Sequence, residues 1–149
     1  MICNNFKDSV GSELLNQSTI TLSDKGSRVT ARFENAQKKA VLKVRLDGQY
    51  FVQTSSCDYL MVLCDLDKCW LIELKGADLN KAYRQLLISL NRLLDKLQKA
   101  NELIAVAVVT RVALPNYRTP EYLKLKRKLD HYFRQNQIIV QGKQYSAVL

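Results

Sequence analysis

Two short apolar runs, separated by a polar turn, constrain the fold more than any other feature of this sequence. The first run begins at Asp58 and ends at Cys64, and the second begins at Cys69 and ends at Lys75. Apart from their charged ends, both are apolar at successive positions, as in strands that are covered on both faces of a sheet. The sequence therefore predicts two central strands joined by the polar residues 65–68.

A long helix and a further strand are expected next. Asp78 is a candidate N-cap, and apolar residues then recur with helical period to about Ala100. The Val-rich segment 103–112 predicts another buried strand. Because a helix intervenes, we expect this strand to lie parallel to the one that ends at Lys75, in a β-α-β crossover.

The segments before the apolar runs predict a short helix and a hairpin. Residues 10–15 form an apolar patch that could be one helix carrying Glu13. Residues 42–46 alternate between apolar and charged side chains, as in a half-exposed strand. Asp47-Gly48 reads as a tight turn, which would lead into a returning strand over residues 49–53.

The end of the chain predicts a second helix and a second hairpin. Thr119 followed by Pro120 is typical of an N-cap with proline at the first helical position, and the helix would cover residues 121–135. Residues 138–149, with a turn at Gly142, predict a terminal hairpin.

Length and composition favour one globular domain over residues 1–149. The chain is 47% hydrophobic and 25% charged, which are ordinary values that disfavour a disordered, collagen-like or coiled-coil chain. No apolar stretch approaches the roughly 18 residues that cross a bilayer, and the first residues resemble neither a signal nor a transit peptide. We expect a cytoplasmic protein with its core over about residues 40–112 and a C-terminal helix and hairpin over 119–149.

The four cysteines are expected to be small buried hydrophobic residues. In a cytoplasmic chain disulfides are rare, and the spacing of Cys3, Cys57, Cys64 and Cys69 matches no CxxC zinc pattern. A zinc site at Cys64 and Cys69 stays a minor alternative, with the only histidine, His131, remote in sequence.

Three charged residues at the ends of the central strands form the candidate site. If the turn centres on residues 66 and 67, Asp58 lies opposite Lys75, and Glu73 shares their sheet face. Burying such groups is costly unless they are paired or coordinated. Two carboxylates suit magnesium, and the lysine could assist an attacking water. The alternative is a structural ion pair between Asp58 and Lys75, with Glu73 partly solvated.

This pattern resembles the PD-(D/E)XK nuclease superfamily. Asp58 is followed after 14 residues by Glu73-Leu74-Lys75 on an apolar strand, and Gln85 lies on the next helix. The resemblance implies an α/β fold with the restriction-endonuclease-like α-β-β-β-α-β core, in which helices flank a mixed central sheet.

The same resemblance implies the roles of individual residues. Asp58, Glu73 and the backbone carbonyl of Leu74 would hold Mg²⁺ or Mn²⁺, and Lys75 would be the catalytic lysine. Gln85 would touch the active site, with a simple hydrogen bond between helix and sheet as the alternative.

An acidic residue from the first helix often completes the site in this superfamily. We expect this residue to be Glu34, with Glu13 as the second candidate.

The charge balance favours a nucleic-acid partner. There are 23 Lys and Arg residues against 14 Asp and Glu, a net charge of +9, although a merely soluble basic domain would look the same. Basic residues cluster over residues 25–45 and 118–143, where solvated faces are the alternative to phosphate contacts. The expected nucleic-acid-binding residues are Lys38, Lys39, Lys43, Arg45, Lys124, Arg127 and Lys128.

We therefore expect a metal-dependent nuclease that hydrolyses phosphodiester bonds of DNA and acts as a homodimer or higher homo-oligomer. The alternative is a catalytically silent module of the same fold that binds nucleic acid or assembles with a partner protein. A third possibility is a protein-interaction subunit whose basic surface meets an acidic partner.

Overall fold

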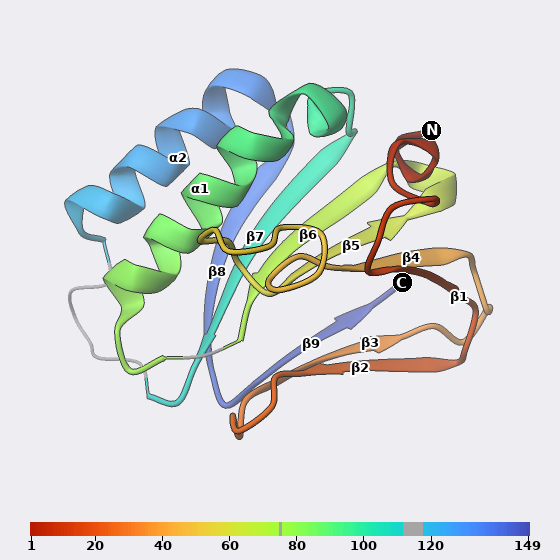
Figure 1. Ribbon diagram of the computed structural model, residues 1–149, viewed down its shortest axis with the longest axis horizontal. Helices are drawn as coiled ribbons and strands as arrows, with labels where there is room; N and C mark the ends of the chain where they lie inside the picture. Colours follow the sequence, from red (N-terminus) through yellow and green to blue (C-terminus); the bar gives the residue numbers. More distant parts are fainter. Residues whose placement is uncertain (75, 112–117) are drawn as a thin grey trace.

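The two apolar runs form the centre of a six-stranded sheet in the computed structural model, which describes residues 1–74, 76–111 and 118–149 (Figure 1). Strands β5 (Tyr59–Leu63) and β6 (Lys68–Glu73) are antiparallel neighbours, and apart from Lys68 every residue in them is buried. This confirms the prediction of two central strands. The remaining strands give the order β1-β4-β5-β6-β7-β8, with β1 (Ser12–Leu15), β4 (Val41–Arg45), β7 (Glu102–Val109) and β8 (Asn136–Gly142).

The predicted crossover is confirmed. Helix α1 (Leu79–Leu97) begins at Asp78, whose side chain accepts a hydrogen bond from the backbone N–H of Lys81, and the helix connects β6 to the parallel strand β7. Helix α2 (Pro120–Tyr132) begins after Thr119, as the proline and its N-cap predicted. The fold class is thus α/β with a mixed sheet.

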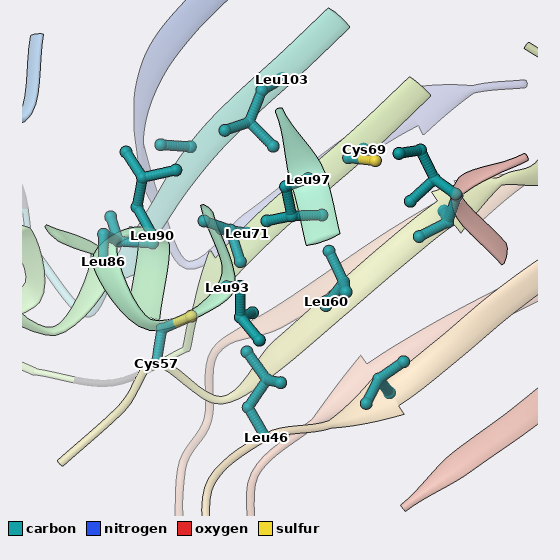
Figure 2. Packing of buried hydrophobic residues seen from close by; sticks show 14 of the residues in the cluster. Leu46, Cys57, Leu60, Cys69, Leu71, Leu86, Leu90, Leu93, Leu97 and Leu103 are labelled. Atoms are coloured by element: carbon teal, nitrogen blue, oxygen red, sulfur yellow. The ribbon is translucent and has the colours of Figure 1, made fainter. Parts of the chain in front are cut away.

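Both helices cover the same face of the large sheet, and a second sheet covers the other face (Figure 1). Leucine side chains such as Leu60 and Leu71 of the sheet and Leu90 of α1 form the core under the helices (Figure 2). Trp70 and Phe33, from the two sheets, pack edge to face in the other core. The second sheet has the order β2-β3-β9, with β2 (Thr19–Ser23), β3 (Thr30–Glu34) and β9 (Gln144–Val148).

The predicted helix over residues 10–15 is wrong, because this segment contains strand β1. Its backbone pairs with the edge of β4, from Ser12 opposite Val44 to Leu15 opposite Val41. A segment this short has little helical stability of its own, whereas an open sheet edge offers a row of backbone partners.

The predicted hairpin after β4 is also wrong. Residues 49–53 form no returning strand, and only an isolated bridge joins Asp47 to Phe51. The long-range partner of β4 is β5, with Arg45 opposite Tyr59. Pairing with a fully apolar strand buries more surface than a local turn does, so the residues after β4 are left as a loop.

The predicted terminal hairpin does not form, because its two strands pair with other strands, although the chain does turn next to Gly142 as predicted. Strand β8 lies parallel to β7 in the large sheet, and β9 lies parallel to β3 in the small one. The chain crosses between the sheets at Lys143, which has a φ of 65° and donates a backbone hydrogen bond to the carbonyl of Val109. The hydrophobic patterns of the β8 and β9 segments are alike, so the sequence alone does not assign these strands to different sheets.

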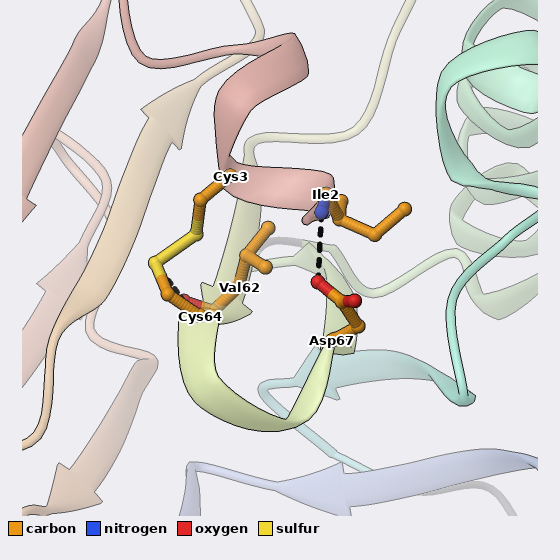
Figure 3. The surroundings of a disulfide bond; sticks show 5 residues. All are labelled: Ile2, Cys3, Val62, Cys64 and Asp67. Atoms are coloured by element: carbon orange, nitrogen blue, oxygen red, sulfur yellow. Dashed lines mark hydrogen bonds between the residues drawn. A yellow bond between two sulfur atoms is a disulfide. The ribbon is translucent and has the colours of Figure 1, made fainter.

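A disulfide joins Cys3 to Cys64, so the expectation that no cysteine is paired is wrong (Figure 3). The backbone N–H of Ile2 donates to the Asp67 carboxylate at 2.7 Å, which brings the N-terminal turn against the β5–β6 connection. Because Cys64 is bonded to Cys3, it is no zinc ligand. Cys57 and Cys69 are free and buried, as predicted.

None of the helices that the structure describes is long and apolar enough to cross a membrane. A disulfide is typical of oxidising compartments, so it lends no support to the cytoplasmic location expected from the sequence.

Candidate active site

The register between β5 and β6 differs by two residues from the predicted one. Leu63 pairs with Lys68 and Tyr59 with Ile72, so residues 64–67 form the connection, and its last residue, Asp67, has a left-handed φ of 46°. The regular register ends at Tyr59, and the backbone N–H of Asp58 bonds to the carbonyl of Ile72, so Asp58 lies beside the end of β6 that carries Glu73. A shift of two residues keeps every side chain on its predicted face, whereas a shift of one would have separated the carboxylates.

Asp58 is held by hydrogen bonds on three sides. Its backbone N–H donates to the carbonyl of Ile72 at 3.0 Å, and its carbonyl accepts from the N–H of Leu46 at 2.9 Å. Its Oδ2 atom accepts from the backbone N–H of Leu74 at 2.8 Å. The residue is only 1% exposed. The sheet thus fixes both the backbone and one carboxylate oxygen of Asp58.

The predicted residues Asp58, Glu73 and Gln85 line one cavity of about 690 Å³. Glu73 is 4% exposed and comes from the end of β6, while Gln85 comes from the second turn of α1. The structure therefore brings together three side chains that the sequence assigned to one site. We call this space the acidic cavity. The rest of its wall consists of the loop after β4 and the start of α1, including Asp47, Gln53, Ser56, Asp78 and Lys81.

Three buried oxygen atoms at the acidic cavity have no hydrogen-bond partner among the described residues. They are Oδ1 of Asp58, Oε1 of Gln85 and Oγ of Ser56. A buried polar atom without a partner is costly and uncommon in a folded protein. All three residues line the acidic cavity, where a bound ligand or solvent would supply a partner for these atoms.

The donor set at this cavity fits a hard divalent cation. No group of three or more His, Cys, Asp or Glu side chains is placed to hold a metal ion within residues 1–74, 76–111 and 118–149. Magnesium does not require such a group, since it is commonly bound through one or two carboxylates, several waters and a substrate phosphate. Asp58 and Glu73 supply the two carboxylates.

Arg45 forms an ion pair with Asp58. Its Nη2 atom lies 2.8 Å from Asp24 Oδ1 and 4.0 Å from Asp58 Oδ1, and its Nη1 atom donates to the Tyr59 hydroxyl at 2.9 Å. Burial lowers the pKa of Arg45, but the hydrogen bonds to Asp24 and Tyr59 outweigh this effect and raise the pKa overall. Arg45, which is expected to contact nucleic acid, thus has Asp24, Asp58 and Tyr59 as partners in the structure.

The residue before Asp58 is anchored to helix α1. The backbone N–H of Cys57 donates to the hydroxyl of Ser89 at 2.7 Å, and both residues are fully buried. Burial raises the pKa of the Cys57 thiol, so the thiol is neutral and unsuited to act as a nucleophile.

Two further residues that the resemblance assigns to the site, Glu34 and Leu74, do not line the acidic cavity. Glu34 ends β3 in the small sheet, pairs with Arg32 at 2.8 Å and does not line the acidic cavity. The carbonyl of Leu74 accepts from the hydroxyl of Ser27 at 3.0 Å, so the expected metal ligand has a protein partner. Lys75 lies outside the described residues.

The predicted basic residues before β5 lie at different ends of the sheet. Lys43 pairs with Glu13 at 3.2 Å and lines a second cavity, which shares Asp47 with the acidic cavity. Lys38 and Lys39 precede β4, whose first residue pairs with Leu63, so they lie at the end of β5 farthest from Asp58. Lys38 and Lys39 are therefore remote from Asp58, whereas Lys43 lies nearer to the acidic cavity.

The three basic residues predicted on α2 do lie together. Lys124, Arg127 and Lys128 line one groove between α1 and α2, separate from the acidic cavity.

Sequence reasoning missed Asp47, Ser56 and Lys81 as residues of the cavity wall. The sequence assigned Asp47 only to a turn, and it assigned Ser56 to no element. Lys81 could have been predicted as a residue of the site from the sequence. It lies three residues after the N-cap Asp78, in the first turn of the helix that follows the strand of Glu73.

Comparisons with protein-family models, curated proteins and solved structures found no match to this chain. The assignment of function rests on the site.

Proposed function

We propose that this chain is a Mg²⁺-dependent nuclease that hydrolyses phosphodiester bonds of DNA, with Asp58 and Glu73 as the metal ligands. The observation that carries the proposal concerns the Oδ1 atom of Asp58, which has no hydrogen bond from the described residues. Asp58 is only 1% exposed and lines the acidic cavity together with Glu73. A buried carboxylate oxygen in such a position is suited to bind a cation.

The order of elements supports the same proposal. Strands β4, β5 and β6 are successive antiparallel neighbours, and α1 then leads to β7, which is parallel to β6. This β-β-β-α-β order supports the resemblance of the motif to the PD-(D/E)XK superfamily. Before β4, the described residues contain three strands where the family core has its first helix.

In this proposal each residue of the cavity has a defined task. A bound Mg²⁺ would neutralise charge on the scissile phosphate and activate a water molecule. Gln85 offers its amide to the substrate or to this water, and the Lys81 ammonium at the wall attracts the phosphate. Lys75, two residues after Glu73, is the proposed catalytic lysine and assists the attacking water.

The alternative function is a silent module that binds nucleic acid without cleaving it. The ion pair between Arg45 and Asp58, at 4.0 Å, favours this alternative because it already gives Asp58 a positive neighbour. In that case Asp58 would serve the stability of the sheet alone.

A cleavage assay separates the two functions. Plasmid, linear duplex, single-stranded and branched DNA would be incubated with Mg²⁺ or Mn²⁺, with EDTA as the metal-free control. We expect metal-dependent cleavage by the natural sequence and at least a roughly 100-fold loss in Asp58→Asn and Lys75→Ala. Glu34→Gln is the matched control, because this carboxylate does not line the cavity, and it should cleave normally.

Absence of cleavage by a folded, DNA-binding protein would overturn the nuclease proposal in favour of the silent module. Cleavage by Asp58→Asn at the normal rate would contradict the proposal that Asp58 is a metal ligand.

A further inference from the structure

A further concave surface, separate from the two cavities described above, lies between the two helices. This groove, of about 480 Å³, is lined from α1 by Leu87 and Asn91 and otherwise by α2. The two helices lie side by side on the large sheet (Figure 1). We call it the helix groove. The residues of α2 that line it are Lys124, Arg127, Lys128, His131 and Tyr132.

The basic residues of the helix groove form one row along α2. Positions 124, 127, 128 and 131 follow the spacing that places side chains on the same face of a helix. The Lys128 ammonium lies 5.0 Å from the centre of the Tyr132 ring, and the rings of His131 and Tyr132 are in contact with centres 4.6 Å apart. These contacts order the side chains before any ligand arrives.

No acidic side chain is found among the described residues that line the groove. The two acidic residues of α2 are engaged elsewhere: Asp130 with Lys126 at 3.1 Å, and Glu121 with Arg84 at 3.7 Å. Hydrogen bonds from Asn136 and Lys126 lower the pKa of Asp130, which keeps this carboxylate ionised beside them. The positive charge of the groove is therefore not compensated by the helix that carries it.

We propose that the helix groove binds the phosphodiester backbone of the polynucleotide that the acidic cavity cleaves. This inference rests on the proposed function. Lysine and arginine contacts to phosphates give affinity that is independent of base sequence. A row of about 10 Å, from the helical rise over seven residues, exceeds what one phosphate needs and suits a continuous chain of phosphates.

Helix α1 connects the groove to the acidic cavity. Gln85 lines the cavity and Asn91 lines the groove, and the helical rise separates them by only about 9 Å along the axis. Along the helix axis, a polynucleotide held at the groove would therefore lie within about two helical turns of the residues of α1 that line the acidic cavity.

The salt dependence of binding tests this proposal. Fluorescence anisotropy with a labelled 30-nucleotide single strand and its duplex, in EDTA, would compare the natural sequence with Lys124→Gln/Arg127→Gln/Lys128→Gln. Each lost phosphate contact lowers the slope of log affinity against log salt by about 0.7–0.9, so we expect a decrease of about 2–3 in the triple variant. A matched control, Lys7→Gln/Arg92→Gln/Lys99→Gln, removes the same charge at exposed sites outside the groove and should change the slope by less than about 1.

An equal change in both triple variants would overturn the proposal, because net charge alone would then explain binding. Tighter binding of polyglutamate than of DNA at the groove would also overturn it and would indicate an acidic protein partner.

A small substrate distinguishes failure of the groove from failure of the cavity. Hydrolysis of bis(4-nitrophenyl) phosphate with Mn²⁺ needs only the acidic cavity, so the groove variant should retain it while losing affinity for DNA. Asp58→Asn should show the opposite behaviour. If the groove variant is folded by thermal melting but loses hydrolysis of the small ester, the groove does not act as a separate binding surface.

Discussion

The Oδ2 atom of Asp58 accepts a hydrogen bond from the backbone N–H of Leu74 at 2.8 Å, so the residue that follows Glu73 in the chain orients the carboxylate of Asp58. The two oxygens of Asp58 therefore have different surroundings. Oδ2 belongs to the sheet, while Oδ1 is at the acidic cavity without a hydrogen bond from the described residues. One residue thus has a structural and a proposed chemical task, and substitutions can separate them.

Asp58→Asn and Asp58→Ala should differ in stability. Asparagine retains an oxygen that can accept from Leu74 N–H, whereas alanine leaves this buried donor without a partner. We expect the free energy of unfolding of the alanine variant to be lower than that of the asparagine variant by about 1–3 kcal/mol. Urea denaturation measures both. Equal stabilities would mean that solvent replaces the carboxylate at Leu74.

Arg45→Met should strengthen divalent cation binding at the acidic cavity. The Arg45 guanidinium is 4.0 Å from Asp58 Oδ1, and its raised pKa keeps it charged over the accessible pH range. Removing this charge removes repulsion of an incoming cation, and we expect Mn²⁺ affinity to rise by roughly three- to tenfold. Electron paramagnetic resonance of free Mn²⁺ provides the measurement.

The matched control for this substitution is Arg32→Met. Arg32 also forms a close ion pair, with Glu34, but both side chains are more than 40% exposed and lie outside the acidic cavity. Its Mn²⁺ affinity should stay unchanged. Weaker binding in Arg45→Met would mean that Arg45 orients Asp58 for the cation and does not compete with it.

The central part of the fold could be predicted because its signals are local and strong. Continuous apolar runs, an aspartate N-cap and a Thr-Pro helix start each specify an element through short-range chemistry. The errors fall where long-range pairing decides. Residues 10–15 and 49–53 have patterns that fit more than one structure, and the strands that compete for each edge determine the outcome.

The candidate site was predictable to the extent that it depends on strand alternation. The two-residue error in register left Asp58 and Glu73 on the same face, because side chains repeat every two residues along a strand. Glu34 was selected by resemblance to a helix that the described residues do not contain. Asp47 and Ser56 come from a loop, whose path toward the cavity has no periodic signal in sequence.

Cys57 and Cys69 should be unreactive in the native protein. Burial raises the pKa of both thiols, so the reactive thiolate forms only at a pH above the ordinary range, and reagent access is blocked as well. Titration with a thiol reagent at pH 8 should detect no thiol in the native, non-reduced protein and two in urea. Detection of four thiols in urea without reductant would contradict the disulfide.

The same two thiols should make stability depend on pH. In the unfolded chain they ionise near their ordinary pKa of 9.0, whereas in the folded chain their pKa is raised. Their contribution is therefore fully present below about pH 9 and decreases as the pH rises further. Urea denaturation of the natural sequence and of Cys69→Ala between pH 8 and 10 should show a smaller decrease for the variant.

Reduction of the Cys3–Cys64 disulfide should destabilise the fold. The bond closes a long loop, since its cysteines are separated by 61 residues in sequence. A disulfide typically raises the free energy of unfolding by about 2–4 kcal/mol. Urea denaturation with and without dithiothreitol measures the loss. The variant Cys3→Ser/Cys64→Ser should match the reduced protein and show no response to the reductant.

Gly11→Ala should destabilise the protein more than Gly26→Ala. Both glycines have a positive φ, of 86° and 83°, so alanine costs roughly 1–2 kcal/mol at either position. A Cβ atom at Gly11 would additionally lie 2.7 Å from the carbonyl oxygen of Arg45, whereas one at Gly26 meets nothing within 4 Å. The clash is with backbone, which cannot move without disturbing the hydrogen bond from Arg45 N–H to the Gly11 carbonyl at 2.9 Å. Thermal melting should therefore rank Gly11→Ala below Gly26→Ala, and equal melting temperatures would show that the edge of β4 shifts without cost.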